Sequence, residues 1–125
     1  MEPGAVLVAL LRQSPAVVAL LADAFYPLVA PQKTPRPYVC YQLIDRAPEP
    51  GSSRACRLGD VARVQLSLFV DDYATLATLT AAITQQLDYA EPEPGVYLEP
   101  DNQQDHHDKD ALCLFRSLDY RVELP

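Results

Sequence analysis

The chain has 125 residues, 49% of them hydrophobic, and a formal net charge of −7 from 17 acidic and 10 basic side chains. This length suits one domain with its own hydrophobic core, which we expect to span residues 1–125. The acidic balance argues against binding to nucleic acid, where Lys and Arg side chains replace the counterions of the phosphate backbone. The three cysteines, Cys40, Cys56 and Cys113, are widely spaced and odd in number, which indicates free thiols made in a reducing cytosol.

An apolar stretch, residues 5–30, lies near the N-terminus and is interrupted by the segment RQSP. Neither half reaches the roughly 20 residues that a membrane-spanning helix needs, and Glu2 stands where a signal peptide carries basic residues. We therefore expect a soluble chain without membrane contact. The pattern instead predicts two short helices, Pro3 to Arg12 and Pro15 to about Ala24, with Ser14 as the N-cap of the second.

The middle of the chain predicts two strands joined by a long loop. Residues 25–37 contain four prolines and predict an extended connector without regular structure. Tyr38–Ile44 is aromatic and β-branched, and its two apolar faces indicate a strand that is central or covered on both sides. Arg46–Arg57 is rich in proline, glycine and serine and predicts a loop longer than usual hairpin connections. Asp60–Val70 alternates apolar and polar residues as a strand does, and only Phe69 breaks the polar face.

The C-terminal half predicts one long helix followed by mostly polar connections. Apolar residues at helical spacing predict a helix over Tyr73–Leu87, which an aspartate at position 71 or 72 would cap. Val96–Glu99 is a candidate for a short strand. Residues 101–110 are all polar and predict an acidic loop.

The last predicted strand is Leu112–Leu124. Arg116 occupies a position where the buried face of this strand requires an apolar side chain, which a β-bulge or a contact with another subunit would explain. Together the elements predict an α+β fold. Its sheet is antiparallel and mostly four-stranded, with the long helix and the two short N-terminal helices packed on one face.

The net charge is concentrated in residues 88–110, where eight acids and one base account for all of the −7. Two interpretations are open. The region is a solvated connection that aids solubility, or it forms an electronegative rim or lumen that repels DNA. Its acids are Asp88, Glu91, Glu93, Glu99, Asp101, Asp105, Asp108 and Asp110.

Residue types that perform catalysis form no recognisable arrangement. The only histidines, His106 and His107, lie in a polar segment, and adjacent ligands on one flexible strip rarely converge on one metal ion. Cys113 is near in sequence, but nothing supplies an orienting third group or an oxyanion hole. We expect no catalytic, cofactor-binding or metal-binding site. Two alternatives stay open: a metal-dependent enzyme that uses these three side chains, and a small cytosolic adaptor that binds a peptide along a sheet edge.

Arginines in a long loop and apolar residues on the outer face of strands indicate contacts with proteins instead. A buried subunit contact would cover the rings of Phe69 and Phe115. The residues that we expect at a subunit or partner contact are Arg46, Arg54, Arg57, Phe69, Phe115 and Arg116.

Four segments in a fixed order carry a resemblance to a known family. They are ALLRQSPAVVALLADAFYPLVAPQ, PRPYVCYQLI, ARVQLSLFVDDYATLATLTAAITQQLD and SLDYRVEL, and together they span nearly the whole chain. The third is the strongest, a strand that ends in acids capping a helix. The chain resembles the small tail-completion, or tail-terminator, proteins of long-tailed bacteriophages and prophages. Its proline-rich insertions, EPEPG and APEPG, are unusual for that pattern.

The resemblance implies a non-enzymatic virion protein, made in the host cytoplasm and located at the head-proximal end of the tail. It implies a ring of identical subunits, a hexamer, that ends the tail tube and joins it to the head. The implied partners are further copies of the chain, the tail-tube protein and the head–tail connector protein. The resemblance also implies long loops that settle on assembly, here Arg46–Arg57 and Glu99–Asp110.

Overall fold

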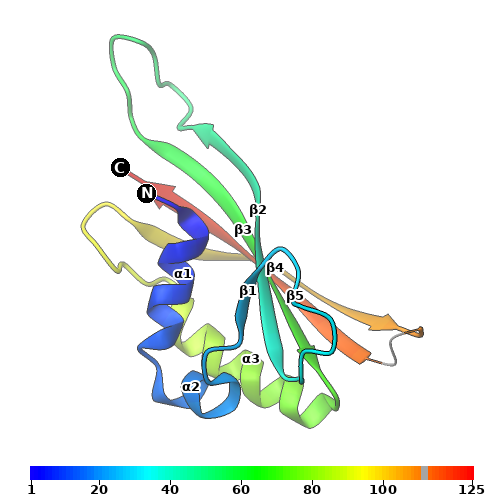
Figure 1. Ribbon diagram of the computed structural model, residues 1–125. Coiled ribbons are helices and arrows are strands. Elements are labelled where there is room, and N and C mark those ends of the chain that lie inside the picture. Colours follow the sequence, from blue (N-terminus) through cyan, green and yellow to red (C-terminus); the bar gives the residue numbers. More distant parts are fainter. Residues whose placement is uncertain (111–112) are drawn as a thin grey trace.

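The computed structural model describes residues 1–110 and 113–125, and Figure 1 shows three helices on one face of a twisted sheet. This arrangement confirms the α+β class and the placement of the helices on one face. The helices are α1 (Pro3–Arg12), α2 (Pro15–Leu21) and α3 (Tyr73–Leu87), and the strands are β1 (Phe25–Pro27), β2 (Tyr38–Pro48), β3 (Asp60–Val70), β4 (Tyr97–Asp108) and β5 (Cys113–Leu124).

The sheet has five strands in the order β1-β2-β3-β5-β4, one more than the four expected. All neighbours are antiparallel except β1 and β2, which run parallel with Phe25 opposite Val39. The prediction that residues 25–37 lack regular structure is therefore wrong at Phe25–Pro27. A strand of three residues that ends in proline has no alternation to read, and its pairing depends on β2, far along the chain.

The prediction of an acidic loop over residues 101–110, and of a long loop over Glu99–Asp110, is also wrong. These residues mostly belong to β4, which pairs with β5 and has one irregularity between Pro100 and Asn102. Since β4 is an edge strand that is almost entirely exposed, it needs no apolar face. Charged residues, proline and a bulge are typical of an edge strand that avoids unwanted pairing.

Several boundaries differ in smaller ways. β2 continues to Pro48 and so includes the start of the predicted Arg46–Arg57 loop, while α2 ends at Leu21. The short strand expected at Val96–Glu99 is the beginning of β4. β5 begins at Cys113, and Leu112 of the predicted strand lies outside the described residues. The bounds of α1, β3 and α3 match the prediction.

Helix caps explain two of the starts that the sequence indicated correctly. The Ser14 hydroxyl accepts a hydrogen bond from the Val17 N–H at the start of α2. Asp72, and not Asp71, caps α3 because its carboxylate accepts the Thr75 N–H at 2.7 Å. This capping lowers the pKa of the Asp72 carboxyl.

The core lies between the helices and the inner face of the sheet. Alternate residues of β3, among them Leu66 and Leu68, are fully buried beneath α3 and α1. From the helices, Leu79 of α3 and Leu11 of α1 contribute side chains with no exposed surface. No single helix in the described residues is long and apolar enough to cross a membrane. The pair α1 and α2 meets that length and composition together, with a 96° bend between them.

Two hairpins extend from diagonally opposite corners of the sheet (Figure 1). We call residues 43–63, at the β2–β3 corner, the arm, and residues 49–59 its tip. We call residues 105–110, at the end of β4, the acidic tip. The register places the start of β3 beside the end of β5 at one end of the sheet, and the end of β4 beside the start of β5 at the other.

Candidate functional site

Arg116 is a cation inside the fold, with only 8% of its side chain exposed. Its guanidinium donates hydrogen bonds to both carboxylate oxygens of Asp105 on β4, to the Tyr73 hydroxyl at 2.9 Å and to the Thr80 hydroxyl at 3.1 Å. The hydrogen bonds from Arg116 lower the pKa of the Asp105 carboxyl, and those to Asp105 raise the pKa of Arg116. The cluster ties the edge strand β4 to β5 and α3.

These contacts explain the basic residue that the sequence pattern placed on a buried face. Strand pairing is continuous on both sides of Arg116, with Leu68 of β3 and Asp105 of β4 as its neighbours. The expectation of a β-bulge at Arg116 is therefore wrong. Whether Arg116 also contributes to a subunit contact stays a prediction.

A second ion cluster lies within the arm, at the base of its tip. Buried Asp60 accepts hydrogen bonds from Arg46 at 2.8 Å and from Arg57 at 2.7 Å. Arg46 also donates to the backbone carbonyl of Met1, which attaches the N-terminus to the arm. The hydrogen bonds from Arg46 and Arg57 lower the pKa of the Asp60 carboxyl. Two of the arginines expected at a partner contact thus also hold the arm in place.

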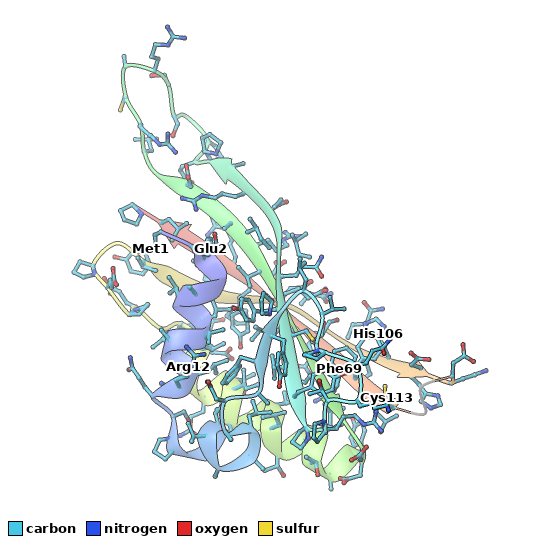
Figure 2. All side chains as sticks on the ribbon, in the orientation of Figure 1. Met1, Glu2, Arg12, Phe69, His106 and Cys113 are labelled. Carbon is cyan, nitrogen blue, oxygen red and sulfur yellow. The ribbon has the colours of Figure 1, made fainter. Side chains whose placement is uncertain are left out.

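The outer face of the sheet carries a row of rings, one from each strand in spatial order. Neighbouring ring centroids are 6.1, 4.9, 4.9 and 4.6 Å apart along the series Tyr26, Tyr38, Phe69, Phe115 and His106. Figure 2 places Phe69 and His106 together, at the end of the sheet remote from Met1. Such packed rings add stability beyond the area that they bury. The sequence identified Phe69 and Phe115 but not their neighbours, since the row depends on strand register.

The two histidines point to opposite faces of β4, and Cys113 begins the neighbouring strand. His106 stacks on Phe115 and lies 3.2 Å from the Ser117 hydroxyl. His107, next to it on a strand, points to the opposite face of the sheet. Cys113 is buried. Among residues 1–110 and 113–125, no group of three or more His, Cys, Asp and Glu side chains converges as a metal site would require.

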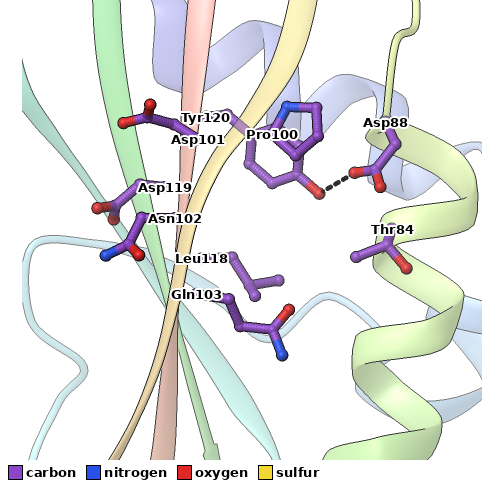
Figure 3. Close-up of a pocket in the computed structure, with 9 residues that line it drawn as sticks. All are labelled: Thr84, Asp88, Pro100, Asp101, Asn102, Gln103, Leu118, Asp119 and Tyr120. Carbon is purple, nitrogen blue, oxygen red and sulfur yellow. Dashed lines mark hydrogen bonds between the residues drawn. The ribbon is translucent and has the colours of Figure 1, made fainter.

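A groove of about 230 Å³ lies between the C-terminal half of α3 and the strands β4 and β5 (Figure 3). Inside it the Tyr120 hydroxyl donates to Asp88 at 2.7 Å, and burial together with this carboxylate raises the pKa of Tyr120. α3 packs mainly on β3 and β5, and the groove lies beside the helix, where β4 forms the edge of the sheet. The residues that line it are Thr84, Asp88, Pro100, Asp101, Asn102, Gln103, Leu118, Asp119 and Tyr120.

The structure separates the predicted contact residues into distinct places. Arg46 and Arg57 meet at Asp60, Phe69 and Phe115 stack on the outer sheet face, and Arg54 stands at the arm tip. The acids of residues 88–110 spread along the edge strand and its preceding turn. Glu99, Asp101 and Asp105 pair with arginines of the sheet, whereas Glu91, Glu93 and Asp110 are exposed.

A solved chain from a structure titled "Virion of native gene transfer agent (GTA) particle" has a TM-score of 0.73 and 21% identity over 99% of this chain and 98% of that chain. At this identity the likeness shows a shared fold. No curated protein sequence matches significantly.

The family described as Tail completion protein gp17 has a sequence model that matches residues 5–123, nearly the full length. That span includes every described helix and strand except the first two residues of α1 and the last residue of β5. The chain therefore belongs to the tail completion protein gp17 family and is a structural component of a virion tail.

Proposed function

We propose that this chain completes the tail tube and joins it to the head, as a ring of identical subunits at the head-proximal end of the tail. The observation that carries the proposal is the family match over residues 5–123. In this proposal the ring is a hexamer. Its partners are the tail-tube protein on one side and the head–tail connector protein on the other.

The two projecting hairpins support a role in assembly. The arm extends beyond the core, and several of its apolar side chains are exposed, with Leu58 at 54% and Ile44 at 43%. In the proposed ring these groups would be buried against neighbouring subunits. Arg46, Arg54, Arg57, Phe69, Phe115 and Arg116 remain our candidates for subunit or partner contacts.

We propose that the role is non-enzymatic. Two side chains that a catalytic site could use are engaged in packing instead, since His106 stacks on Phe115 and Cys113 is buried. The ionised groups pair with one another at Asp60 and at Arg116. We also propose that the chain makes no specific contact with nucleic acid, since the acidic residues 88–110 would repel a phosphate backbone.

The proposal is tested by mixing the purified chain with polymerising tail-tube protein. Rings seen at one end of each tube by negative-stain microscopy, together with a narrower distribution of tube lengths, are the expected result. The matched control is tube protein incubated with bovine serum albumin. Tubes that grow to the same lengths with and without the chain, with no extra density at their ends, would refute the proposal.

A further inference from the structure

The sheet has a free strand edge on each side, and the two free edges are of similar length. β2 pairs with β1 only at residues 39–41, so among the described strands residues 42–48 have β3 as their single neighbour. β4 pairs with β5 alone, which leaves residues 102–107 with a neighbour on one side as well. We call these segments the β2 edge and the β4 edge. Both are exposed except for half-buried His106.

The β2 edge carries apolar side chains that the single chain leaves in water. Leu43 and Ile44 are each 43% exposed. The register shift between Leu43 and Asp45 places Ile44 outside the ladder with β3. The edge begins Gln42-Leu43-Ile44, without the charges and prolines by which natural strand edges avoid pairing. An exposed edge of this composition is a place where a further strand adds.

The features that hinder pairing of β4 lie at its start. Pro100 and the irregularity that follows it come before Asn102. From Asn102 to His107 the pairing with β5 is regular and the sequence contains no proline. Arg116 binds both oxygens of Asp105, so the charge in the middle of the β4 edge is already neutralised within the chain. The same contact holds the edge in place for an incoming strand.

We propose that the β4 edge of one copy pairs with the β2 edge of the next, so that the sheet continues from subunit to subunit. This inference rests on the proposed ring and names its contact surfaces. β2 and β4 run in opposite directions, because the pairs β2–β3, β3–β5 and β5–β4 are all antiparallel. Copies of the same orientation therefore meet as an antiparallel pair, which main-chain hydrogen bonds hold together. Since the two edges differ, the contact is heterologous, as a closed ring requires.

The positions of the two edges fit such a closure. Asp45 lies level with Arg63 of β3. Asp105 lies level with Leu68 of β3, with Arg116 between them. To bring the edges side by side, each copy shifts along the strands by about five residues, or roughly 17 Å. The strands β2, β3, β5 and β4 span roughly 19 Å across. A ring of such steps is level when its strands tilt by about 40°, a tilt typical of closed sheets.

Disulfide cross-links test the pairing. In a Cys56→Ser background, where the remaining cysteines are buried, Ala47→Cys and Gln104→Cys add one exposed thiol to each edge, on the sheet face without helices. Protein assembled on tail tubes is oxidised with copper–phenanthroline in air and run on a non-reducing gel. We expect a ladder of covalent multimers larger than dimers from the double variant, or from Ala47→Cys with Asn102→Cys, which samples the adjacent register. Neither Ala47→Cys alone nor Gln104→Cys with Ala77→Cys on α3 should give the ladder.

A charge placed on the β2 edge tests the same contact by another route. Ile44→Lys should lower the fraction of subunits in rings several-fold, because charged side chains oppose strand addition. The matched control is Val18→Lys on α2, where the wild-type side chain is similarly exposed at 41%, and it should form rings normally. Circular dichroism confirms that each variant folds.

The outcomes separate this contact from the proposed function. If wild-type rings form on tubes but neither double variant gives multimers larger than dimers, or Ile44→Lys forms rings normally, the edge pairing is refuted while the proposed function stands. Covalent dimers from Ala47→Cys or Gln104→Cys alone would show that like edges meet, which also refutes it. If wild-type protein forms no rings, the proposed function itself fails.

Discussion

Removal of the carboxylate that neutralises Arg116 should cost more stability than removal of Arg116 itself. Asp105→Ala leaves a cation in a site where only 8% of its side chain is exposed. Breaking a fully buried ion pair from one side costs about 3–5 kcal/mol. Here the cost is smaller, because Asp105 is 48% exposed and Arg116 retains the hydroxyls of Tyr73 and Thr80. We therefore expect a loss of about 2 kcal/mol, close to the value of a hydrogen bond to a charged group.

The opposite change, Arg116→Met, fills the site with an apolar side chain and leaves the Asp105 carboxylate to be hydrated by water. We expect it to cost less than about 1 kcal/mol, since an apolar replacement in such a site is often neutral. Urea denaturation followed by circular dichroism measures the free energy of unfolding of both variants. In a separate thermal melt, the melting temperature of Asp105→Ala should fall by roughly 6–10 °C. Glu99→Ala is the matched control, because Arg121 keeps Glu123 as a partner.

The ranking of the two variants decides whether Arg116 is a buried charge that depends on Asp105. If Arg116→Met destabilises the chain more than Asp105→Ala, the arginine contributes mainly through packing and the reasoning is refuted. Hydrogen exchange adds a local readout. Relative to the wild type, Asp105→Ala should increase the exchange rate of β4 amides more than that of β3 amides, because the cluster ties this edge strand to α3.

The pKa of the Asp105 carboxyl is lower in the folded chain than in the unfolded chain, where it is about 4. The contribution of Asp105 to stability is therefore present above about pH 4 and is lost as the pH falls further. Asp105→Asn should flatten the acid side of a plot of unfolding free energy against pH. Asp60→Ala should speed hydrogen exchange in the arm and leave α3 unchanged, and equal protection of the arm in both proteins would contradict the ion cluster there. Leu66→Ala should cost about 2–5 kcal/mol in urea denaturation, whereas exposed Leu58→Ala should stay within about 0.5 kcal/mol.

The helices and the central strand were predictable because their signals are local. The Ser14-Pro15 start, the aspartate cap of α3 and the strict alternation of β3 each lie within a few residues of the element that they define. β4 was not predictable in this way. Beyond Leu98 its residues are exposed except for half-buried His106, so the sequence shows no hydrophobic periodicity there, and the segment is a strand because it pairs with β5.

The sequence indicated which residues make unusual contacts, but not which other side chains they meet. The sequence marked Arg116 as a residue out of place, but its partner Asp105 lies eleven positions away and is found only through the β4–β5 register. The row of rings has the same origin, since it takes one side chain from each of five strands. His106 stacks in that row, a packing role that its polar sequence neighbours gave no reason to expect.

The central claim is that this chain ends a tail tube as a ring. The most direct measurement is the cryo-electron microscopy of tail tubes assembled with the chain, classified by tube end. We expect a closed ring of identical subunits at one end only. Tube ends without added density, or the chain distributed along the tube wall, would contradict it.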